Sequence, residues 1–423
     1  MEKKKVVEQQ NKEHSYFYSL ELEGINCFKV KQTLDLSDGN GNHSPWIIIL
    51  GDNGTGKTTL LRVLDRMQPS VIKTDYYTPV IWSYNSILMS KKSGVKLKVN
   101  DDIKEFYVEE NENRENNSSF ITKGNQIFPF LLSYGASRRM SRNENLSPKN
   151  QGNLKITSLF DESIELINAE EWFLQKEWAS FKSTGITKQK FENDFNLVKY
   201  ILIDILPDVI DIQSKPIDEN NSKPILEVKT SYGWVNLRNL SFGYQTLTAL
   251  IVDIASKMME QYPNGDNPLQ EPAVILIDEI DLHLHPKWQR TVIDKLSQHF
   301  PKAQFIATSH SPLIVQAALD KKANIVVCRK EGDKVVIDNN PDEVKGWRID
   351  QILTSDLFEV ESPRSKNTQE NLDEYMILKG KSELTQKDKE KIEELTPNIE
   401  KAYPKTTSDL DEKLSKFAEK YLK

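Results

Sequence analysis

The chain has 423 residues, of which 38% are hydrophobic and 28% charged, and its formal net charge is −7. This length allows two or three domains, and the acidic balance excludes a globally basic nucleic-acid-binding protein, so any contact with nucleic acid needs a local basic patch. No run approaches the ~20 apolar residues of a membrane span and the first residues lack an apolar signal core, so we expect a cytoplasmic protein with no membrane partner.

Alternating residues predict strands in the first part of the chain, over residues 16–22 and 27–36. A turn-rich segment, residues 38–45, then leads into an apolar strand at 46–50. Further short strands are expected over residues 80–110, a flexible polar loop at 111–119 and a buried strand at 128–134. Two cysteines, Cys27 and Cys328, lie in apolar runs and are expected to be free thiols.

A phosphate-binding loop follows the apolar strand at 46–50. Residues 51–58 read G-D-N-G-T-G-K-T, and a helical pattern continues to residue 67. Glycines at these positions let backbone N–H groups face phosphate oxygens, and the start of a helix favours a negative charge. Lys57 is expected to reach the β- and γ-phosphates, and the Thr58 hydroxyl to bind Mg²⁺. The expected ATP-binding residues are Asn53, Gly54, Thr55, Gly56, Lys57, Thr58 and Thr59.

Residues 160–206 carry aromatic and aliphatic side chains among charges at helical spacing, which predicts two helices. Core packing explains this aromatic stripe better than a cofactor site. From residue 240 onward, helical and strand-like segments alternate, with an apolar strand at 273–277, a helix beginning at Pro286 and a strand at 304–308. This alternation predicts an α/β fold whose mainly parallel sheet has helices on both faces.

Polar side chains follow two of the predicted strands directly. Asp278 and Glu279 follow the strand at 273–277, and His310 follows the next one. Asp278 is expected to hold Mg²⁺ together with Thr58, and Glu279 to orient and deprotonate the attacking water. His310 is expected to hydrogen-bond a γ-phosphate oxygen or that water. An acidic strand end facing solvent and a structural histidine are the alternatives.

Other histidines and a serine-glycine turn complete the set of candidates. His283 and His285 have no third metal ligand nearby, so a role in a loop or an interface is the better interpretation. Residues 240–245 read L-S-F-G-Y-Q and are expected to open a helix, with Ser241 at its N-terminus.

The order of these motifs resembles the ABC ATPase superfamily, in its RecF-like and SMC-like branch, over about residues 16–340. This resemblance implies an ABC-type P-loop NTPase head made of residues 1–145 and 225–340, a helical arm or lid at 146–224 and a C-terminal helical, partner-binding extension at 341–423. It also implies that Ser241 and Gly243 face a nucleotide bound at Lys57 of a second copy, in a homodimer or a larger assembly. Phe242 departs from the usual glycine, and Gln126 is the nearest candidate for the glutamine of the lid-connecting loop.

A narrower resemblance links the chain to ATPases of prokaryotic anti-phage defence, the PtuA family of Septu and some retron systems. It rests on the segments at residues 134–138, 278–289, 304–312 and 349–355. This resemblance implies an ATPase that assembles with a separate HNH nuclease, the PtuB-like subunit, and restrains or licenses it.

Several other functions remain open. A RecF-like repair protein would bind DNA directly through a local basic surface, for which the candidates are Arg138, Arg139, Arg142, Lys91, Lys92, Lys96 and Lys98. A scaffold that binds ATP with little turnover is a further alternative, since Phe242 alters the signature turn. A transporter ATPase would require a membrane partner, and an OLD-type nuclease would require TOPRIM carboxylates that residues 340–423 do not offer.

Overall fold

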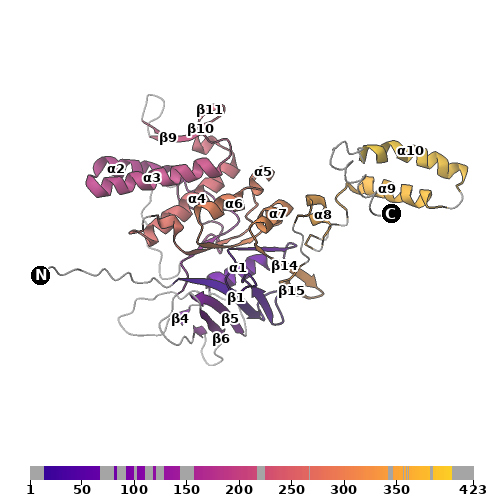
Figure 1. Ribbon diagram of the computed structural model, residues 1–423, viewed down its shortest axis with the longest axis horizontal. Coiled ribbons are helices and arrows are strands. Elements are labelled where there is room, and N and C mark those ends of the chain that lie inside the picture. Colours follow the sequence, from indigo (N-terminus) through magenta and orange to yellow (C-terminus); the bar gives the residue numbers. More distant parts are fainter. Residues whose placement is uncertain are drawn as a thin grey trace. The chain divides into compact units, whose positions relative to one another are not determined.

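The computed structural model describes residues 14–66, 81–82, 92–99, 102–109, 118–120, 128–142, 157–216, 224–265, 267–341, 346–355, 357–358, 360, 362–381 and 384–402. The chain divides into two compact units, residues 1–349 and 350–423. Figure 1 draws the elements of both units, and each unit is described by itself.

A six-stranded sheet forms the centre of the first unit, in the order β15-β14-β3-β13-β12-β8. Its neighbouring strands are parallel except for the hairpin of β14 and β15. Every residue of β12 and β13 is buried, which follows from their apolar composition and from the cover on both faces of the sheet. Parallel pairing brings the carboxyl ends of β3, β13, β12 and β8 to one edge. The strands are β3 (Trp46–Gly51), β8 (Leu131–Tyr134), β12 (Ala273–Ile277), β13 (Ala303–Thr308), β14 (Asn324–Glu331) and β15 (Lys334–Asp338).

A second six-stranded sheet is antiparallel and has the order β2-β1-β5-β6-β7-β4. The strand expected to begin at Cys27 begins only at Gln32, because the Phe28 N–H bonds to the Ile25 carbonyl at 2.8 Å and closes a turn. The short strands expected over residues 80–110 are present. The strands are β1 (Ser15–Glu23), β2 (Gln32–Asp35), β4 (Ile81–Trp82), β5 (Lys92–Val99), β6 (Asp102–Glu109) and β7 (Ser118–Phe120).

Helix α1 (Lys57–Arg66) joins these two sheets into one core. Its buried residues cluster with apolar side chains of β1 and β3. A buried polar contact also joins the sheets, because the fully buried Gln304 side chain of β13 bonds both backbone groups of Phe17 in β1. The Phe17 N–H donates to Gln304 Oε1 at 2.9 Å, and Gln304 Nε2 donates to the Phe17 carbonyl at 2.8 Å.

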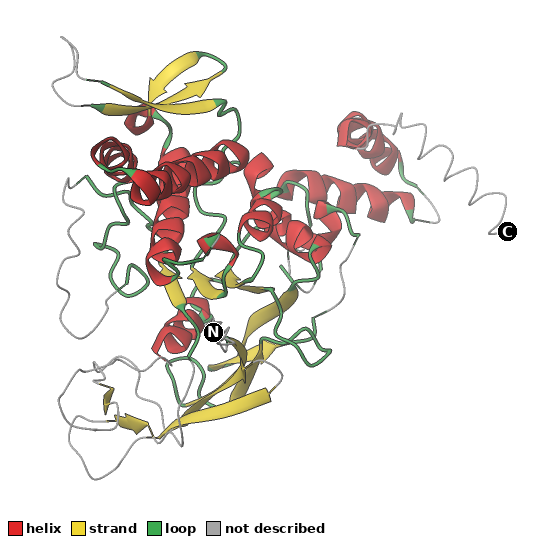
Figure 2. Cartoon of the chain, turned by 60° about the vertical axis from the view of Figure 1, so that its left-hand side comes forward, coloured by secondary structure: helices red, strands yellow, loops and turns green. Residues whose placement is uncertain are grey.

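Further helices complete the head, and Figure 2 shows them beside the yellow strands of the central sheet. Helix α4 (Phe242–Gln261) is one of them, and fourteen of its twenty residues are buried. The single helix expected from Pro286 consists instead of two pieces, α5 (Pro286–Gln289) and α6 (Val292–His299). Helix α7 (Pro312–Asp320) follows β13, and the short 3-10 helices are η1 (Leu237–Asn239) and η2 (Pro268–Gln270).

Helices α2 (Ala169–Lys182) and α3 (Gly185–Ile205) follow β8 in the sequence and lie side by side in space. The pattern of residues 160–206 predicted these two helices. The predicted core packing of the aromatic stripe is confirmed for Trp172 and Phe173, which are buried. The same prediction is wrong for Trp178 and Phe181, whose exposed fractions are 64% and 75%. A three-stranded sheet follows, in the order β11-β10-β9, with β9 (Asp211–Lys215), β10 (Ile225–Thr230) and β11 (Gly233–Asn236).

The second unit is helical over its described residues. Helices α9 (Lys366–Lys379) and α10 (Gln386–Ala402) pack on each other, and the Ser365 side chain caps the start of α9. Helix α8 (Ile349–Leu353) lies at the boundary between the two units. Among the helices of the described segments, none is both long and apolar enough to cross a bilayer.

The α/β fold predicted from the sequence, with a mainly parallel sheet flanked by helices, is therefore confirmed.

Candidate nucleotide site

A glycine-rich loop connects β3 to α1 and forms a cradle at the carboxyl edge of the central sheet. Gly51, Gly54 and Gly56 all have positive φ angles, of 135°, 81° and 83°. At Gly56 a Cβ atom would lie 2.5 Å from the Cys27 Sγ and 2.7 Å from a Phe28 ring carbon, so only glycine fits there. The loop therefore has the backbone that a phosphate cradle requires.

Lys57 is the first residue of α1 and only 7% of it is exposed. Its ammonium group donates to the carbonyls of Gly51 and Asp52, both at 2.8 Å, and so lies across the mouth of the loop. Burial lowers the pKa of Lys57, while the nearby charges, Asp278 and Glu279 among them, act in the opposite direction. The cation is thus held by two carbonyls of the loop, and the nearby carboxylates favour its charged form.

The acidic strand end faces the phosphate loop through a chain of hydrogen bonds. Thr58 Oγ1 donates to one oxygen of the Asp278 carboxylate at 2.8 Å, and Thr308 Oγ1 donates to the other at 2.6 Å. Thr308 Oγ1 in turn accepts the N–H of Glu279 at 2.7 Å. A hydroxyl beside a nearly buried carboxylate is a donor set that fits Mg²⁺, a hard cation that prefers oxygen ligands.

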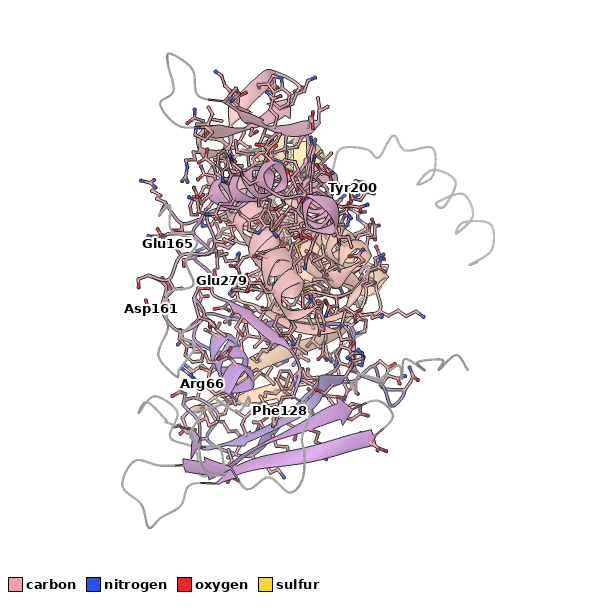
Figure 3. The ribbon with its side chains drawn as sticks, turned by 90° about the vertical axis from the view of Figure 1, so that its left-hand side faces the viewer. Arg66, Phe128, Asp161, Glu165, Tyr200 and Glu279 are labelled. Atoms are coloured by element: carbon pink, nitrogen blue, oxygen red, sulfur yellow. The ribbon has the colours of Figure 1, made fainter. Side chains whose placement is uncertain are left out.

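Glu279 leaves the strand in an unusual backbone conformation. Its φ angle is +49°, in the left-handed region that non-glycine residues seldom adopt. The following residue is tied to the neighbouring strand, because the Ile280 N–H donates to the Thr308 carbonyl at 3.0 Å. Glu279 is labelled in Figure 3, at the level between the helices of the head and the antiparallel sheet. The turn aims the half-buried Glu279 at the mouth of the cradle.

A cavity of about 320 Å³ brings these residues together, and its size and lining suit a polar, phosphate-bearing ligand. His310 lies at its rim, exposed, and its backbone N–H donates to Asp281 Oδ1 at 3.3 Å. Thr55 lies beneath the loop, where its hydroxyl bonds to the Asp52 carbonyl at 2.8 Å. The lining residues are Asn26, Cys27, Asn53, Gly54, Gly56, Lys57, Thr58, Thr59, Asp278, Glu279 and His310.

Asn26 and Cys27 were not among the sequence candidates. Asn26 has a φ angle of +48° and its side-chain amide approaches the Thr59 hydroxyl at 3.5 Å. A turn signal, G-I-N at residues 24–26, was present in the sequence, but nothing local shows that this turn reaches the phosphate loop. Cys27 and Cys328 are both free thiols, as expected.

Ser241 and Gly243 lie apart from this cavity, since neither is among the residues that line it. Ser241 is the exposed residue before α4, and its side chain makes no capping bond. A Cβ atom on Gly243 would lie 2.4 Å from the His283 carbonyl oxygen, and the Phe242 ring contacts the His283 ring edge-on at 4.7 Å. Residues 240–243, which we call the signature segment, therefore rest on the loop that follows Asp278 and Glu279.

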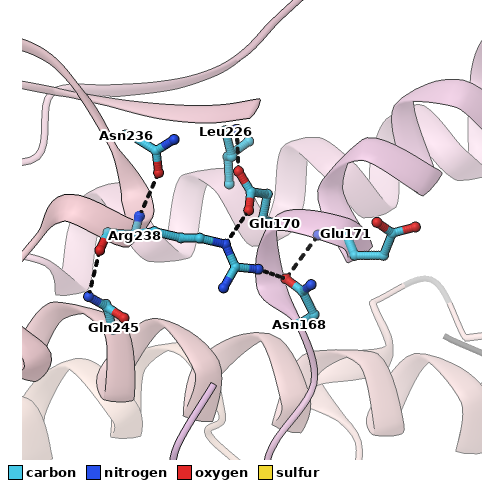
Figure 4. A network of polar contacts seen from close by, with 7 residues as sticks. All are labelled: Asn168, Glu170, Glu171, Leu226, Asn236, Arg238 and Gln245. Carbon is cyan, nitrogen blue, oxygen red and sulfur yellow. Dashed lines mark hydrogen bonds and ion pairs between the residues drawn. The ribbon is translucent and has the colours of Figure 1, made fainter. Parts of the chain in front are cut away.

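A polar network holds the signature segment from the side of α2, as Figure 4 shows. Arg238 Nε bonds to Glu170 Oε2 at 2.6 Å, and Arg238 Nη2 donates to Asn168 Oδ1 at 3.0 Å. The other Glu170 oxygen accepts the Leu226 N–H at 3.0 Å. The Gln245 amide donates to the carbonyls of Arg238 and Leu240, at 3.0 and 2.8 Å. These bonds fix the residues immediately before Ser241.

The prediction that Arg138 belongs to a basic surface is wrong, because only 3% of this residue is exposed. Arg139 and Arg142 are exposed, and Lys96 is half-buried and has a partner. Lys91 and Gln126 lie outside the described residues, as do the side chains of Lys92 and Lys98.

His283 and His285 lie between Glu279 and α5 and make structural contacts, which agrees with their interpretation as loop or interface residues. His283 packs against Phe242, and His285 Nδ1 accepts the Lys287 N–H at 3.2 Å at the start of α5. Within the described ranges, no group of three or more His, Cys, Asp or Glu side chains could hold a metal ion.

Comparisons with known proteins identify the family to which the chain belongs. The protein-family model described as "AAA domain, putative AbiEii toxin, Type IV TA system" matches residues 47–316, more than half of the chain. The Septu protein PtuA of Bacillus mycoides (strain KBAB4) is 28% identical over 407 residues, which cover 92% of this chain and 52% of the relative. A Septu protein PtuA of Bacillus thuringiensis is 26% identical and covers 83% and 85% of the two chains. The "Retron Ec83 probable ATPase" of Escherichia coli is 38% identical over 37% of this chain and 28% of its own length.

The chain thus spans about half the length of the Bacillus mycoides relative. Among solved structures, the SMC head domain from Thermotoga maritima has a TM-score of 0.43 at 13% identity, covering 76% of this chain and 98% of its own. The protein belongs to the AAA-domain family that this family model describes, and it is similar to the Septu protein PtuA and to the retron ATPases.

Proposed function

We propose that this chain binds ATP with Mg²⁺ and hydrolyses it in sites shared between two copies of itself. The observation that carries this proposal is the bond between Thr58 and Asp278 at the mouth of the glycine-rich cradle. It places the two expected Mg²⁺ ligands together, beside Lys57 and Glu279, in one cavity of suitable chemistry.

Five residues of the cavity have distinct side-chain roles in this proposal. Lys57 and the loop N–H groups bind the β- and γ-phosphates, and Glu279 orients and deprotonates the attacking water. His310, at the rim, hydrogen-bonds the water or a γ-phosphate oxygen. Thr58 and Asp278 hold Mg²⁺, which when bound would neutralise charge that develops on the phosphate oxygens.

The second copy would supply the signature segment. Ser241 is exposed, lies apart from the cavity of its own chain and has no capping bond. The first N–H groups of a helix have no partner within it, so the start of α4 would favour an anion. Ser241 and Gly243 of one copy would therefore contact the nucleotide held at Lys57 of the other, in a head-to-tail dimer.

A mixing experiment tests the shared site. Lys57→Ala should abolish ATP binding at its own cradle, and Ser241→Arg should block the cradle of the opposite copy, so each variant alone should be inactive. Mixed in equal amounts, the two should recover about one quarter of wild-type turnover, because half of the dimers are mixed and each of these keeps one intact site. Full activity of Ser241→Arg alone, or no recovery in mixtures that are shown to contain mixed dimers, would refute the shared site.

We further propose that the ATPase belongs to an anti-phage defence complex and regulates a separate HNH nuclease. The support is the similarity to Septu PtuA proteins over most of the chain and to retron ATPases over a smaller part of it. The exposed α9–α10 pair, with Met376 and Ile377 at the surface, is the proposed partner contact. A nuclease encoded beside this gene should copurify with the full chain and be lost on deletion of residues 365–423, while ATP binding persists. Retention of the nuclease by the shortened chain would exclude this contact.

A DNA-repair ATPase that binds DNA directly is the main alternative. It has less support here because Arg138, one of its expected basic contacts, is buried. Binding of duplex DNA by the chain alone, weakening steeply with salt, would favour it.

A further inference from the structure

Arg138 is a buried cation at the edge of the sheet where the candidate site lies. It follows β8 by four residues, and β8 pairs in parallel with β12, which ends immediately before Asp278. The Asp278 N–H itself bonds to the Tyr134 carbonyl at 2.9 Å. The loop that carries Arg138 and the turn that carries Glu279 are therefore neighbours at the carboxyl ends of adjacent strands.

The guanidinium of Arg138 donates to three backbone carbonyls of this region. Its Nη1 donates to the carbonyl of Asp278 and, at 3.1 Å, to that of Gly135, and its Nη2 donates to the Glu279 carbonyl at 2.9 Å. Two consecutive carbonyls of the strand end are thus held by one planar group, whose rigid fork fixes their relative orientation. Arg138 does not line the cavity, so these bonds act on the turn and not on a ligand.

The cation remains charged despite its burial. Burial lowers the pKa of Arg138 to about 10, and the charges of Asp278, Asp281 and Glu279 act against this shift. A buried guanidinium is costly unless its donors are satisfied, and here two of the three accepting carbonyls belong to the turn that contains the proposed base.

Glu279 needs such support because of its backbone. Its φ angle of +49° is sparsely populated by non-glycine residues and persists only where the surroundings fix it. Arg138 itself has a φ angle of +30°. Arg138 and Glu279 thus both have strained backbones, and the Arg138 side chain bonds to the Glu279 carbonyl.

We infer that Arg138 is a positioning residue for Glu279: its guanidinium holds the turn that aims the Glu279 carboxylate at the nucleotide cavity. This inference rests on the proposed function, because it concerns the geometry of the proposed base. It assigns to Arg138 an effect on turnover and none on the affinity for nucleotide.

The same loop links this turn to the segment that leads into α2. The Leu166 N–H donates to the Arg139 carbonyl at 2.7 Å, and the Ser141 N–H donates to the Leu166 carbonyl at 3.0 Å. Ser137 Oγ donates to the Glu162 carbonyl at 3.2 Å. Residues that precede α2 thus fix the backbone of the loop that carries Arg138.

Substitution of Arg138 by methionine in the full-length chain tests the inference. Arg138→Met should lower kcat about 10- to 100-fold, a part of the 10²–10⁴ that a positioned base contributes, and leave the Kd of a fluorescent ATP analogue nearly unchanged. Arg139→Met makes the same substitution at the exposed neighbour and should leave both quantities unchanged. An unaltered kcat in Arg138→Met, or a loss of nucleotide affinity that accounts for its lost turnover, would overturn the inference.

A double-mutant cycle separates this role from general structural support. If Arg138 acts through Glu279, Arg138→Met should cause no further loss of turnover in the Glu279→Gln background. A further loss of the same size there would overturn the inference and leave the proposed function standing. Wild-type turnover in Glu279→Gln would instead refute the proposed base itself.

A conservative variant keeps the test decisive if Arg138→Met does not fold. Arg138→Lys retains the positive charge but lacks the planar fork, so it should bind nucleotide normally and turn over at a rate between those of Arg138→Met and the wild type. Wild-type turnover in Arg138→Lys, combined with a misfolded Arg138→Met, would show that the residue only stabilises the fold.

Discussion

The phosphate-loop half and the signature half of the proposed site are built in different ways. The first is made of strand ends and one helix start, and its polar groups bond to one another, from Thr58 through Asp278 to Thr308. The second is the start of α4, and it is held from the side of α2 by the bond between Arg238 and Glu170.

This difference separates the groups proposed to act in hydrolysis from the segment proposed to contact the nucleotide of the second copy. The groups proposed to do the chemistry are fixed by the register of a buried parallel sheet and by the loops at its carboxyl edge, including the loop that carries Arg138. The signature segment takes its position from the base of α2 and from the loop at His283. Changes in the first half should therefore act on the chemical step, and changes in the second on how two copies combine.

The largest effect is expected from Glu279→Gln, which breaks the first half alone. The amide cannot accept a proton from water, so turnover should fall about 10²- to 10⁴-fold while nucleotide binding is retained. The ATP-bound dimer should then accumulate, as measured by light scattering after size-exclusion chromatography. Glu260→Gln, at an exposed position of α4, is the control. Unchanged turnover of Glu279→Gln would defeat its assignment as the base.

A smaller effect is expected from Arg238→Met, which loosens the second half. Glu170, whose side chain is 11% exposed, would lose its ionic partner, at a cost of about 1–3 kcal/mol in the free energy of unfolding. Turnover should fall while the nucleotide affinity of a single copy stays the same, as measured by phosphate release and by titration at low protein concentration. Arg290→Met, on the surface after α5, is the matched control. If Arg238→Met weakened nucleotide binding by a single copy, the two halves would not be separable.

The smallest effect is expected at Asp204, which joins α3 to α6 away from both halves. Its carboxylate bonds to Lys295 at 2.6 Å and to His299 at 2.8 Å. Partial burial acts to raise the pKa of Asp204, but the hydrogen bonds and charges of these two partners outweigh it and lower the pKa. A lowered carboxyl pKa contributes stability above the unfolded value of about 3.9, and this stability is lost as the pH falls through the folded value.

Asp204→Asn should therefore lower the melting temperature at pH 7, by the equivalent of about 1 kcal/mol or less. The difference from wild type should shrink below about pH 4, and turnover at pH 7 should be unchanged. Asp320→Asn, at an exposed position of α7, controls for the loss of a charge. A loss of turnover in Asp204→Asn would mean that α3 and α6 also position the site.

Local signals explain how much of this architecture was predictable. The phosphate loop, the apolar strands and the residues at their ends have short-range patterns, and parallel pairing brings the ends together. The break between α5 and α6 and the late start of β2 at Gln32 depend on hydrogen bonds that no periodicity reports. Trp178 and Phe181 fit a helical stripe but face solvent, because the pattern gives the spacing and not the partner.

Arg138 shows the same limit within the site. In the sequence it is one of three arginines near residue 140, and its neighbours Arg139 and Arg142 are indeed at the surface. Only the pairing of β8 with β12 places Arg138 beside Asp278 and Glu279. The carbonyls that it binds are present in every residue, so no sequence motif could reveal them.

The contact between Gln304 and Phe17 has a mechanical consequence. One amide side chain takes up both backbone groups of a residue in the other sheet, as a neighbouring strand would, and it does so without solvent. This contact fixes the position of β1 relative to β13. If one sheet slid over the other, the backbone N–H and carbonyl of Phe17 would lose their Gln304 partner in the interior. A pull on β1 would therefore be transmitted to β13, whose last residue, Thr308, bonds to Asp278.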